Sequence, residues 1–138
     1  MNERDSKFVT LSIYLIAISL GLFLVANIAR KSQPIEITAT ESREMLQALG
    51  GGGTQIIAFV TDWCPVCQYA ERYLKQQQIS YIRADIEKDR VSRKYFDDIA
   101  SRTGSSGIPQ IVVGTKVIVG FDQHGFEAAR QALLKEAK

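Results

Sequence analysis

The chain has 138 residues, a formal net charge of +2 and a hydrophobic fraction of 46%, values that are ordinary for one small folded domain. Its 17 lysines and arginines are not gathered into basic runs, which argues against a nucleic-acid partner because phosphate binding needs clustered cations. The charged residues are unevenly placed, however, and residues 8–29 contain none.

Residues 8–29 form an uncharged run of 22 residues. As a helix this run rises about 33 Å, which exceeds a hydrocarbon core of about 30 Å. The length predicts a single transmembrane helix that anchors the chain in membrane lipid, preceded by a tail of residues 1–7. A cleaved signal peptide is the alternative, but its apolar core usually has about 7 to 15 residues and ends in a small-x-small site. Leu24 and Asn27 stand where small residues are preferred before such a cut.

The orientation of this anchor follows less directly, because the positive-inside rule compares the cations at the two ends of a span. Arg4 and Lys7 precede the span, and Arg30, Lys31 and Arg43 follow it. The count slightly favours a cytoplasmic domain, whereas translocation of a short tail with two cations is unfavourable. We therefore expect a single-pass membrane protein with its domain on the extracytoplasmic (periplasmic) side, and the opposite orientation stays open.

Residues 30–53 are predicted to be a linker that includes a short helix. A short connector leads from the span to Thr38, which with Glu41 has the spacing of a capping box and predicts a helix that runs to Leu49. Four glycines at 50–53 follow. Because no Lys-Ser or Lys-Thr pair comes after them, we expect a flexible joint here and not a phosphate-binding loop.

Residues 54–138 show the pattern of a small α/β domain, in which short apolar runs alternate with amphipathic stretches. Strands are predicted at 56–60, 80–85, 110–113 and 116–119. Helices are predicted at 65–78, between Asp89 and Gly104, and at 126–134. The order β-α-β-α-β-β-α makes the first two strands parallel through a right-handed crossover and adds an antiparallel hairpin.

Both cysteines of the chain, Cys64 and Cys67, lie in the sequence WCPVC, where the first strand of this domain passes into its helix. Free backbone N–H groups and the helix dipole stabilise a thiolate in this position, so Cys64 is expected to ionise more readily than a free cysteine. Pro65 suits the first helical position, which needs no N–H. Cys67 returns to the same face three residues later, within reach of a mixed disulfide at Cys64. The predicted chemistry is thiol–disulfide exchange.

Other uses of the cysteine pair remain open. A structural zinc site needs four ligands, and the one other soft ligand, His124, is 57 residues beyond Cys67. No metal site within one chain is therefore expected, while a site shared by two chains stays conceivable. A static disulfide is less favoured, because such a short loop removes little chain entropy.

Four ordered motifs between Gln55 and Ala137 resemble the glutaredoxin branch of the thioredoxin superfamily. They are VTDWCPVC at 60–67, ADIEKD at 84–89, GIPQ at 107–110 and GFD at 120–122. The resemblance covers nearly all of the chain beyond the linker. It implies a thioredoxin-like, glutaredoxin-type α/β domain of three layers, preceded here by the N-terminal transmembrane helix.

The resemblance also implies roles for individual residues. Cys64 would be the catalytic nucleophile and Cys67 the resolving thiol. Pro109 matches the family's cis-proline, which leaves the backbone of Ile108 free to pair with a bound peptide or with glutathione. The other residues expected to bind the substrate or glutathione are Trp63, Pro65, Gly120, Phe121 and Asp122.

The predicted function is that of a membrane-anchored thiol–disulfide oxidoreductase acting on protein or glutathione mixed disulfides. Phe121 replaces the second glycine of the family's γ-glutamyl loop, as in glutaredoxin-like donors that take electrons from thioredoxin reductase. Glutathione, as a co-substrate, and thioredoxin reductase are thus the two expected electron donors, and no tightly bound cofactor is expected. Two alternatives remain: an iron–sulfur or metal carrier that uses Cys64 in a dimer, against which Pro65 weighs, and an anchored redox-sensing or adaptor module.

Overall fold

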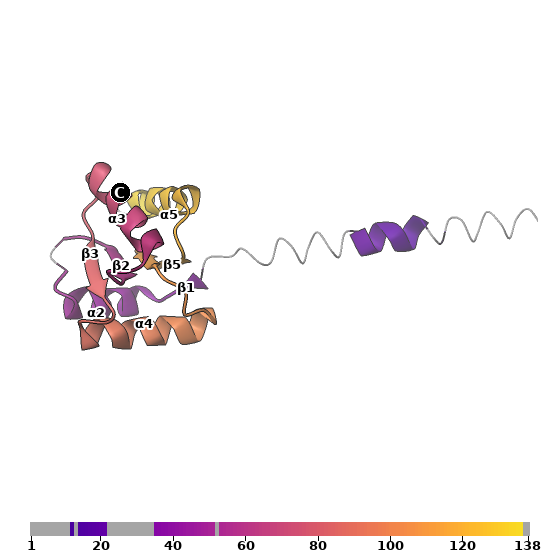
Figure 1. Ribbon diagram of the computed structural model, residues 1–138. Helices are drawn as coiled ribbons and strands as arrows, with labels where there is room; N and C mark the ends of the chain where they lie inside the picture. Colours follow the sequence, from indigo (N-terminus) through magenta and orange to yellow (C-terminus); the bar gives the residue numbers. More distant parts are fainter. Residues whose placement is uncertain (1–11, 13, 22–34, 52, 137–138) are drawn as a thin grey trace, which may run out of the picture. The chain divides into compact units, whose positions relative to one another are not determined.

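The computed structural model describes residues 12, 14–21, 35–51 and 53–136. The chain divides into two compact units, residues 1–33 and 34–138. In the first unit residues 14–21 are helical (Figure 1). The predicted tail at 1–7 and most of the predicted membrane span at 8–29 lie outside the described residues. Within the described ranges, no helix combines the length and the apolar character needed to cross a membrane.

A five-stranded sheet between two helical layers makes up the second unit (Figure 1). Its strands are β1 (Ile35–Glu36), β2 (Ile56–Val60), β3 (Ile82–Asp85), β4 (Gln110–Val113) and β5 (Lys116–Val119), in the spatial order β1-β5-β4-β2-β3. The helices are α2 (Ala39–Ala48), α3 (Pro65–Gln76), α4 (Arg90–Thr103) and α5 (Gln123–Glu136). Helices α3 and α5 cover one face of the sheet, and α2 and α4 cover the other.

Two hydrophobic cores follow from the alternation of side chains along the strands. On β2, Ile56, Ala58 and Val60 pack with residues of α3 and α5, whereas Ile57 and Phe59 pack with residues of α2 and α4. Every residue of β2 is buried, as expected of a strand with a helical layer on each face. The prediction of a buried central strand at 56–60 is confirmed.

The predicted element order beyond residue 54 is also confirmed. Strand β2 pairs parallel with β3 and antiparallel with β4, and β4 and β5 form the hairpin. The predicted strand at 80–85 begins later, because the parallel register starts with the pair Ile57–Ile82. Helix α3 ends at Gln76, before Gln78, whose φ of 56° is not helical.

Helix α5 begins three residues earlier than the sequence pattern predicted, at Gln123 instead of Phe126. The carboxylate of Asp122 accepts a hydrogen bond from the N–H of Gly125 at 2.8 Å. The Asp122 carbonyl accepts one from the N–H of Phe126 at 2.9 Å. Asp122 thus acts as the N-cap and extends the helix over residues that show no apolar periodicity.

At the start of this unit one prediction is confirmed and one is corrected. The capping box is present: the Thr38 hydroxyl accepts from the N–H of Glu41, and the Glu41 carboxylate accepts from the N–H of Thr38. The connector before Thr38 is in part a strand, because β1 pairs antiparallel with β5. Two residues are too few to show strand alternation in a sequence. The buried Ser42 hydroxyl donates to the Gly114 carbonyl at 2.6 Å and holds α2 on the β4–β5 turn.

Candidate active site

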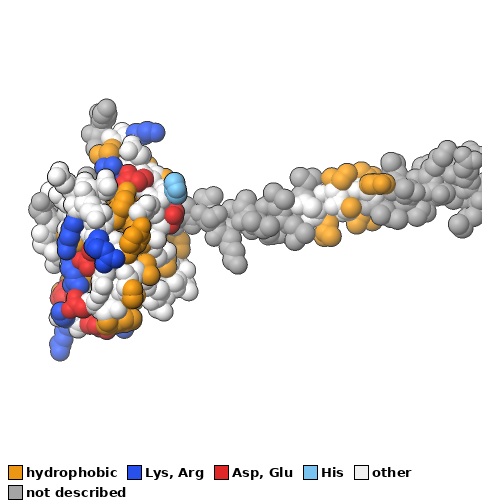
Figure 2. Space-filling model, turned by 45° about the horizontal axis from the view of Figure 1, so that its top comes forward, with side chains coloured by type: hydrophobic (Ala, Val, Ile, Leu, Met, Phe, Trp, Pro, Cys, Tyr) orange, Lys and Arg blue, Asp and Glu red, His pale blue; other side chains and the backbone are white. Residues whose placement is uncertain are grey.

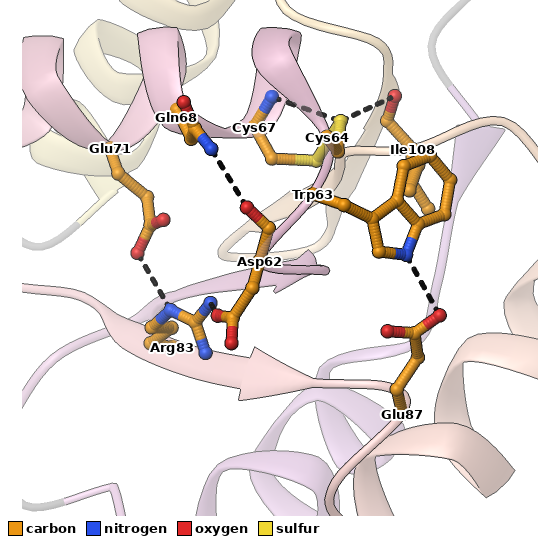
Figure 3. The surroundings of a disulfide bond; sticks show 9 residues. All are labelled: Asp62, Trp63, Cys64, Cys67, Gln68, Glu71, Arg83, Glu87 and Ile108. Atoms are coloured by element: carbon orange, nitrogen blue, oxygen red, sulfur yellow. Dashed lines mark hydrogen bonds and ion pairs between the residues drawn. A yellow bond between two sulfur atoms is a disulfide. The ribbon is translucent and has the colours of Figure 1, made fainter.

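The start of α3 carries both cysteines (Figure 3). Cys64 is the N-cap, and its Sγ accepts the N–H of Cys67 at 3.1 Å. Pro65 is the first helical residue, as predicted. Cys64 and Cys67 form a disulfide with their Cα atoms 5.2 Å apart. The sequence-based placement of the pair at a strand–helix junction is therefore confirmed.

The loop before β4 forms a second wall of the site. The Ile108–Pro109 peptide bond is cis, as the resemblance implied, and the Ile108 carbonyl oxygen lies 3.9 Å from Sγ of Cys64 (Figure 3). The fully buried Gln110 donates from its side-chain amide to the Ser105 carbonyl at 2.7 Å. The N–H of Gly120 donates to the Pro109 carbonyl at 2.7 Å. Hydrogen bonds on both sides thus hold this loop against Cys64.

Gly120, Phe121 and Asp122 form the third part of the site. Gly120 has a φ of 80°, a left-handed conformation that favours glycine. The half-buried ring of Phe121 belongs to a cluster with the rings of Tyr69, Tyr73 and Phe126, at centroid distances of 5.5 to 6.1 Å. The side chain is therefore held between α3 and α5, and its contact with a substrate stays a prediction.

Three exposed apolar side chains lie close to the two cysteines in sequence. Trp63 is 65% exposed, Val66 46% and Tyr69 47%. We call these three side chains the apolar rim. The indole N–H of Trp63 donates to a carboxylate oxygen of Glu87 at 2.9 Å (Figure 3), which fixes the ring beside the disulfide. Tyr69 accepts a hydrogen bond from the side-chain amide of Gln123 at 2.7 Å.

A charged network beside the cysteine motif was missed by the sequence analysis. Arg83 on β3 pairs with three carboxylates, those of Asp62 at 2.5 Å, Asp85 at 2.9 Å and Glu71 at 3.0 Å. Lys88 also pairs with Asp62, and this hydrogen bond lowers the pKa of the Asp62 carboxyl. The parallel register, in which Val60 stands beside Asp85, brings these distant residues together. The predicted parallel pairing of these two strands was the feature of the sequence from which the network could have been found.

The predicted site residues meet at one edge of the sheet. Sγ of Cys64 contacts the Ile108 carbonyl, and the Pro109 carbonyl accepts a hydrogen bond from the N–H of Gly120. The ring of Phe121 packs against that of Tyr69 on α3. Trp63 and Pro65 flank Cys64 in sequence, and Asp122 caps the neighbouring helix. In the part of the chain that the structure describes, no group of three or more His, Cys, Asp and Glu side chains is placed to hold a metal ion.

Comparison with known proteins shows what this arrangement resembles. Residues 56–118 match the family model for glutaredoxin. The chain contains a glutaredoxin-like domain. It is 29% identical over 65 residues to an uncharacterized glutaredoxin-like 8.6 kDa protein in the rubredoxin operon of Clostridium pasteurianum, a match that covers 47% of this chain and 83% of that protein.

Solved structures resemble the same glutaredoxin-like domain. Wheat glutaredoxin has a TM-score of 0.50 at 20% identity, covering 74% of this chain and 99% of its own. A mutated buckwheat glutaredoxin has a TM-score of 0.50 at 17% identity, covering 69% of this chain and 94% of its own. These likenesses confirm the predicted thioredoxin-like α/β fold. The family match supports a glutaredoxin-like domain over residues 56–118, and the paired cysteines in it support a thiol–disulfide redox function.

Proposed function

We propose that this chain is a thiol–disulfide oxidoreductase that reduces disulfides through Cys64 and Cys67. The observation that carries the proposal is the cysteine pair at the N-cap and first turn of α3, facing the cis-proline loop of a glutaredoxin-like domain. Backbone N–H groups at a helix start stabilise a thiolate, which is the nucleophile in disulfide exchange.

The two cysteines differ in burial, and this difference supports different roles for them. Cys64 keeps 4% of its surface exposed, whereas Cys67 has none. A substrate sulfur approaching from solvent therefore meets Cys64 first. Cys67 lies behind it, on the same side of the helix, and is placed to attack Cys64 from within the protein. This supports Cys64 as the nucleophile and Cys67 as the resolving thiol.

The proposed cycle moves two electrons. The Cys64 thiolate attacks one sulfur of the substrate disulfide, forms a mixed disulfide and releases the other substrate sulfur as a thiolate. The Cys67 thiolate then attacks Sγ of Cys64, closes the Cys64–Cys67 disulfide and releases the second substrate thiolate. The released thiolates take up the two protons that the cysteine thiols lost. Two molecules of glutathione, or the dithiol of thioredoxin reductase, return two electrons and two protons to the pair.

The cis-proline loop would hold the substrate in place. Among the backbone hydrogen bonds of the described loops and turns, none uses the N–H of Ile108. An extended substrate segment can therefore pair with this backbone as an added strand, which brings its sulfur to Cys64. The binding site around that segment would be completed by Trp63, Pro65, Gly120, Phe121 and Asp122.

Single-cysteine variants test the proposed function. With the neutral disulfide of 2-mercaptoethanol as substrate and a neutral dithiol as reductant, Cys64→Ser is expected to lose all activity. Cys67→Ser should instead accumulate a mixed disulfide between Cys64 and the substrate, which intact-mass spectrometry detects and excess thiol removes. Full activity in both variants would contradict the proposal.

We also propose that residues 8–29 anchor this domain in a membrane, with the domain on the extracytoplasmic side. The support is the sequence alone, since the 22-residue run carries no charge and is long enough to span. The full-length chain should stay in the membrane pellet after an alkaline carbonate wash. In intact cells treated with a reductant, a membrane-impermeant maleimide should label the cysteines before permeabilisation. Release by carbonate would contradict the anchor, and labelling only after permeabilisation would contradict the orientation.

A further inference from the structure

The apolar rim lies at the place where a substrate must approach. Of the six large apolar side chains exposed among residues 35–136, three are Trp63, Val66 and Tyr69. In Figure 2 the side of α3 and α5 is turned forward, and exposed hydrophobic side chains lie there between acidic and basic ones. Because the disulfide is flanked by this rim, any partner whose sulfur reaches Cys64 also covers apolar surface. The partner is thus expected to bring an apolar side chain next to its own cysteine.

Two carboxylates next to this surface, those of Glu87 and Asp122, form no ion pair among the described residues. Glu87 is exposed and accepts the Trp63 indole N–H, and Asp122 is exposed and accepts the N–H of Gly125. The carboxylate of Asp62 differs, because it pairs with both Arg83 and Lys88.

The sheet topology places these two carboxylates on opposite sides of Cys64. Strands β2, β3 and β5 run in the same direction, because β2 pairs parallel with β3 and β4 is antiparallel to both β2 and β5. The carboxyl ends of these strands therefore lie at one edge of the sheet. Cys64 follows β2, Glu87 follows β3 on one side, and Asp122 follows β5 on the other.

A bound chain that crosses the disulfide thus passes an unpaired negative charge on each side. We propose that this surface docks a protein segment in which Lys or Arg residues flank the reactive cysteine and an apolar residue adjoins it, and that Glu87 and Asp122 select this charge. The inference rests on the proposed function and names its substrate class. Substrates with acidic flanks are disfavoured at the same surface by like-charge repulsion.

Two matched peptides test the charge preference. Each carries one cysteine in a mixed disulfide with 2-mercaptoethanol and an adjacent leucine, and the cysteine is flanked by two lysines in one peptide and by two glutamates in the other. The reduced full-length protein should release the lysine peptide about fivefold to tenfold faster at low salt. The ratio should approach one at about 0.5 M salt, where exposed charges are screened.

Charge-neutralising variants assign the preference to the two carboxylates. Glu87→Gln keeps an acceptor for the Trp63 indole, and Asp122→Asn keeps one for the N–H of Gly125. Each is expected to lower the lysine-to-glutamate rate ratio by about twofold to threefold. Glu44→Gln is the matched control, because Glu44 is exposed on α2, on the other face of the sheet, and it should leave the ratio unchanged.

The outcomes separate this inference from the proposed function. A wild-type ratio near one, or a ratio that neither Glu87→Gln nor Asp122→Asn lowers, overturns the charge preference while disulfide reduction still stands. Failure of the wild-type protein to reduce both peptides and the neutral 2-mercaptoethanol disulfide overturns the proposed function itself. A faster reaction with the glutamate peptide would also overturn the inference, because it would show that the bound peptide does not lie next to the carboxylates of Glu87 and Asp122.

Discussion

The N-termini of α2 and α3 are capped by different chemistry. Helix α2 is capped by the Thr38 hydroxyl, and Glu41 adds a carboxylate to its first turn. Helix α3 is capped by the sulfur of Cys64, and its first turn holds no acidic residue. A carboxylate at a helix start stabilises the helix by interacting with the dipole. Helix α3 lacks that stabilisation, which leaves its dipole and free N–H groups available to the thiolate of Cys64.

The charges near the two helix starts also differ. Glu41 pairs with Arg102 of α4 at 2.7 Å, a contact that ties α2 to its neighbour. Beside α3, the carboxylate of Asp62 is paired with Arg83 and Lys88, so it adds little net negative charge next to Cys64. The carboxylate of Glu41 thus stabilises the start of α2, whereas the first turn of α3 contains no carboxylate.

The largest effect is expected from Cys64→Ser, which gives α3 an oxygen cap like that of α2. Serine is a good N-cap, so the free energy of unfolding of the reduced protein should change by no more than about 1 kcal/mol. Disulfide reduction should be lost completely, because a hydroxyl cannot replace the thiolate. Urea unfolding and turnover of the same sample check both statements. A loss of stability well beyond this range would show that Cys64 is more than a cap in the reduced fold.

A carboxylate placed in the first turn of α3 would remove the difference between the two helices. Val66 is exposed, so Val66→Glu should fold. The added charge competes with the thiolate for the dipole, and the rate of Cys64 alkylation at neutral pH should fall about twofold to fivefold. The measurement is iodoacetamide alkylation against pH in the Cys67→Ser background. Val66→Gln is the control, and an equal fall in that variant would assign the effect to lost apolar contact.

Thr38→Ala is the corresponding change in α2. It removes the hydroxyl that accepts from the N–H of Glu41, and the free energy of unfolding should fall by about 1 kcal/mol. Disulfide reduction by the folded protein should be unaffected, because α2 lies on the face of the sheet opposite α3. Thr38→Ser should retain both properties. Lost activity in a folded Thr38→Ala protein would show that the two helix starts are coupled.

The smallest effect is a pH dependence at α2. Hydrogen bonds from Thr38, followed by that of Arg102, lower the pKa of Glu41 from 4.5 to about 2. Because the pKa of the folded state is the lower one, the contribution of Glu41 to stability is present above pH 4.5 and is lost as the pH falls towards 2. The melting-temperature difference between the wild type and Glu41→Gln should therefore shrink over this window. A difference that is constant with pH would contradict the assigned cause.

Local sequence patterns predicted those features of the fold that depend on interactions between residues close together in the sequence. The helix start at Pro65 follows from the cysteine motif, and the capping box follows from the spacing of Thr38 and Glu41. Contacts that depend on strand register were not predicted. Strand β1 forms because its backbone pairs with the otherwise free edge of β5. The ion pair between Arg83 and Asp62 forms because β3 lies parallel to β2.

The same distinction holds within the candidate site. Cys64 and Cys67 were found from their own spacing, and Pro109 from a matching motif. Glu87 lies within the motif at 84–89, but that motif predicts no role for it, because its hydrogen bond to Trp63 joins residues 24 positions apart. Asp122 was named as a binding residue, while its action as a helix cap depends on where α5 begins.

The full burial of Cys67 behind Cys64 has a consequence for oxidative damage. A peroxide that enters the site meets the Cys64 thiolate first and converts it to a sulfenic acid. That acid condenses readily with a neighbouring thiol to form a disulfide, and Cys67, three residues away and shielded from solvent, is that neighbour. The product is the disulfide of the proposed cycle, and a thiol reductant converts it back to the dithiol. The arrangement that we propose resolves a substrate mixed disulfide would thus also trap the sulfenic acid before it is oxidised irreversibly.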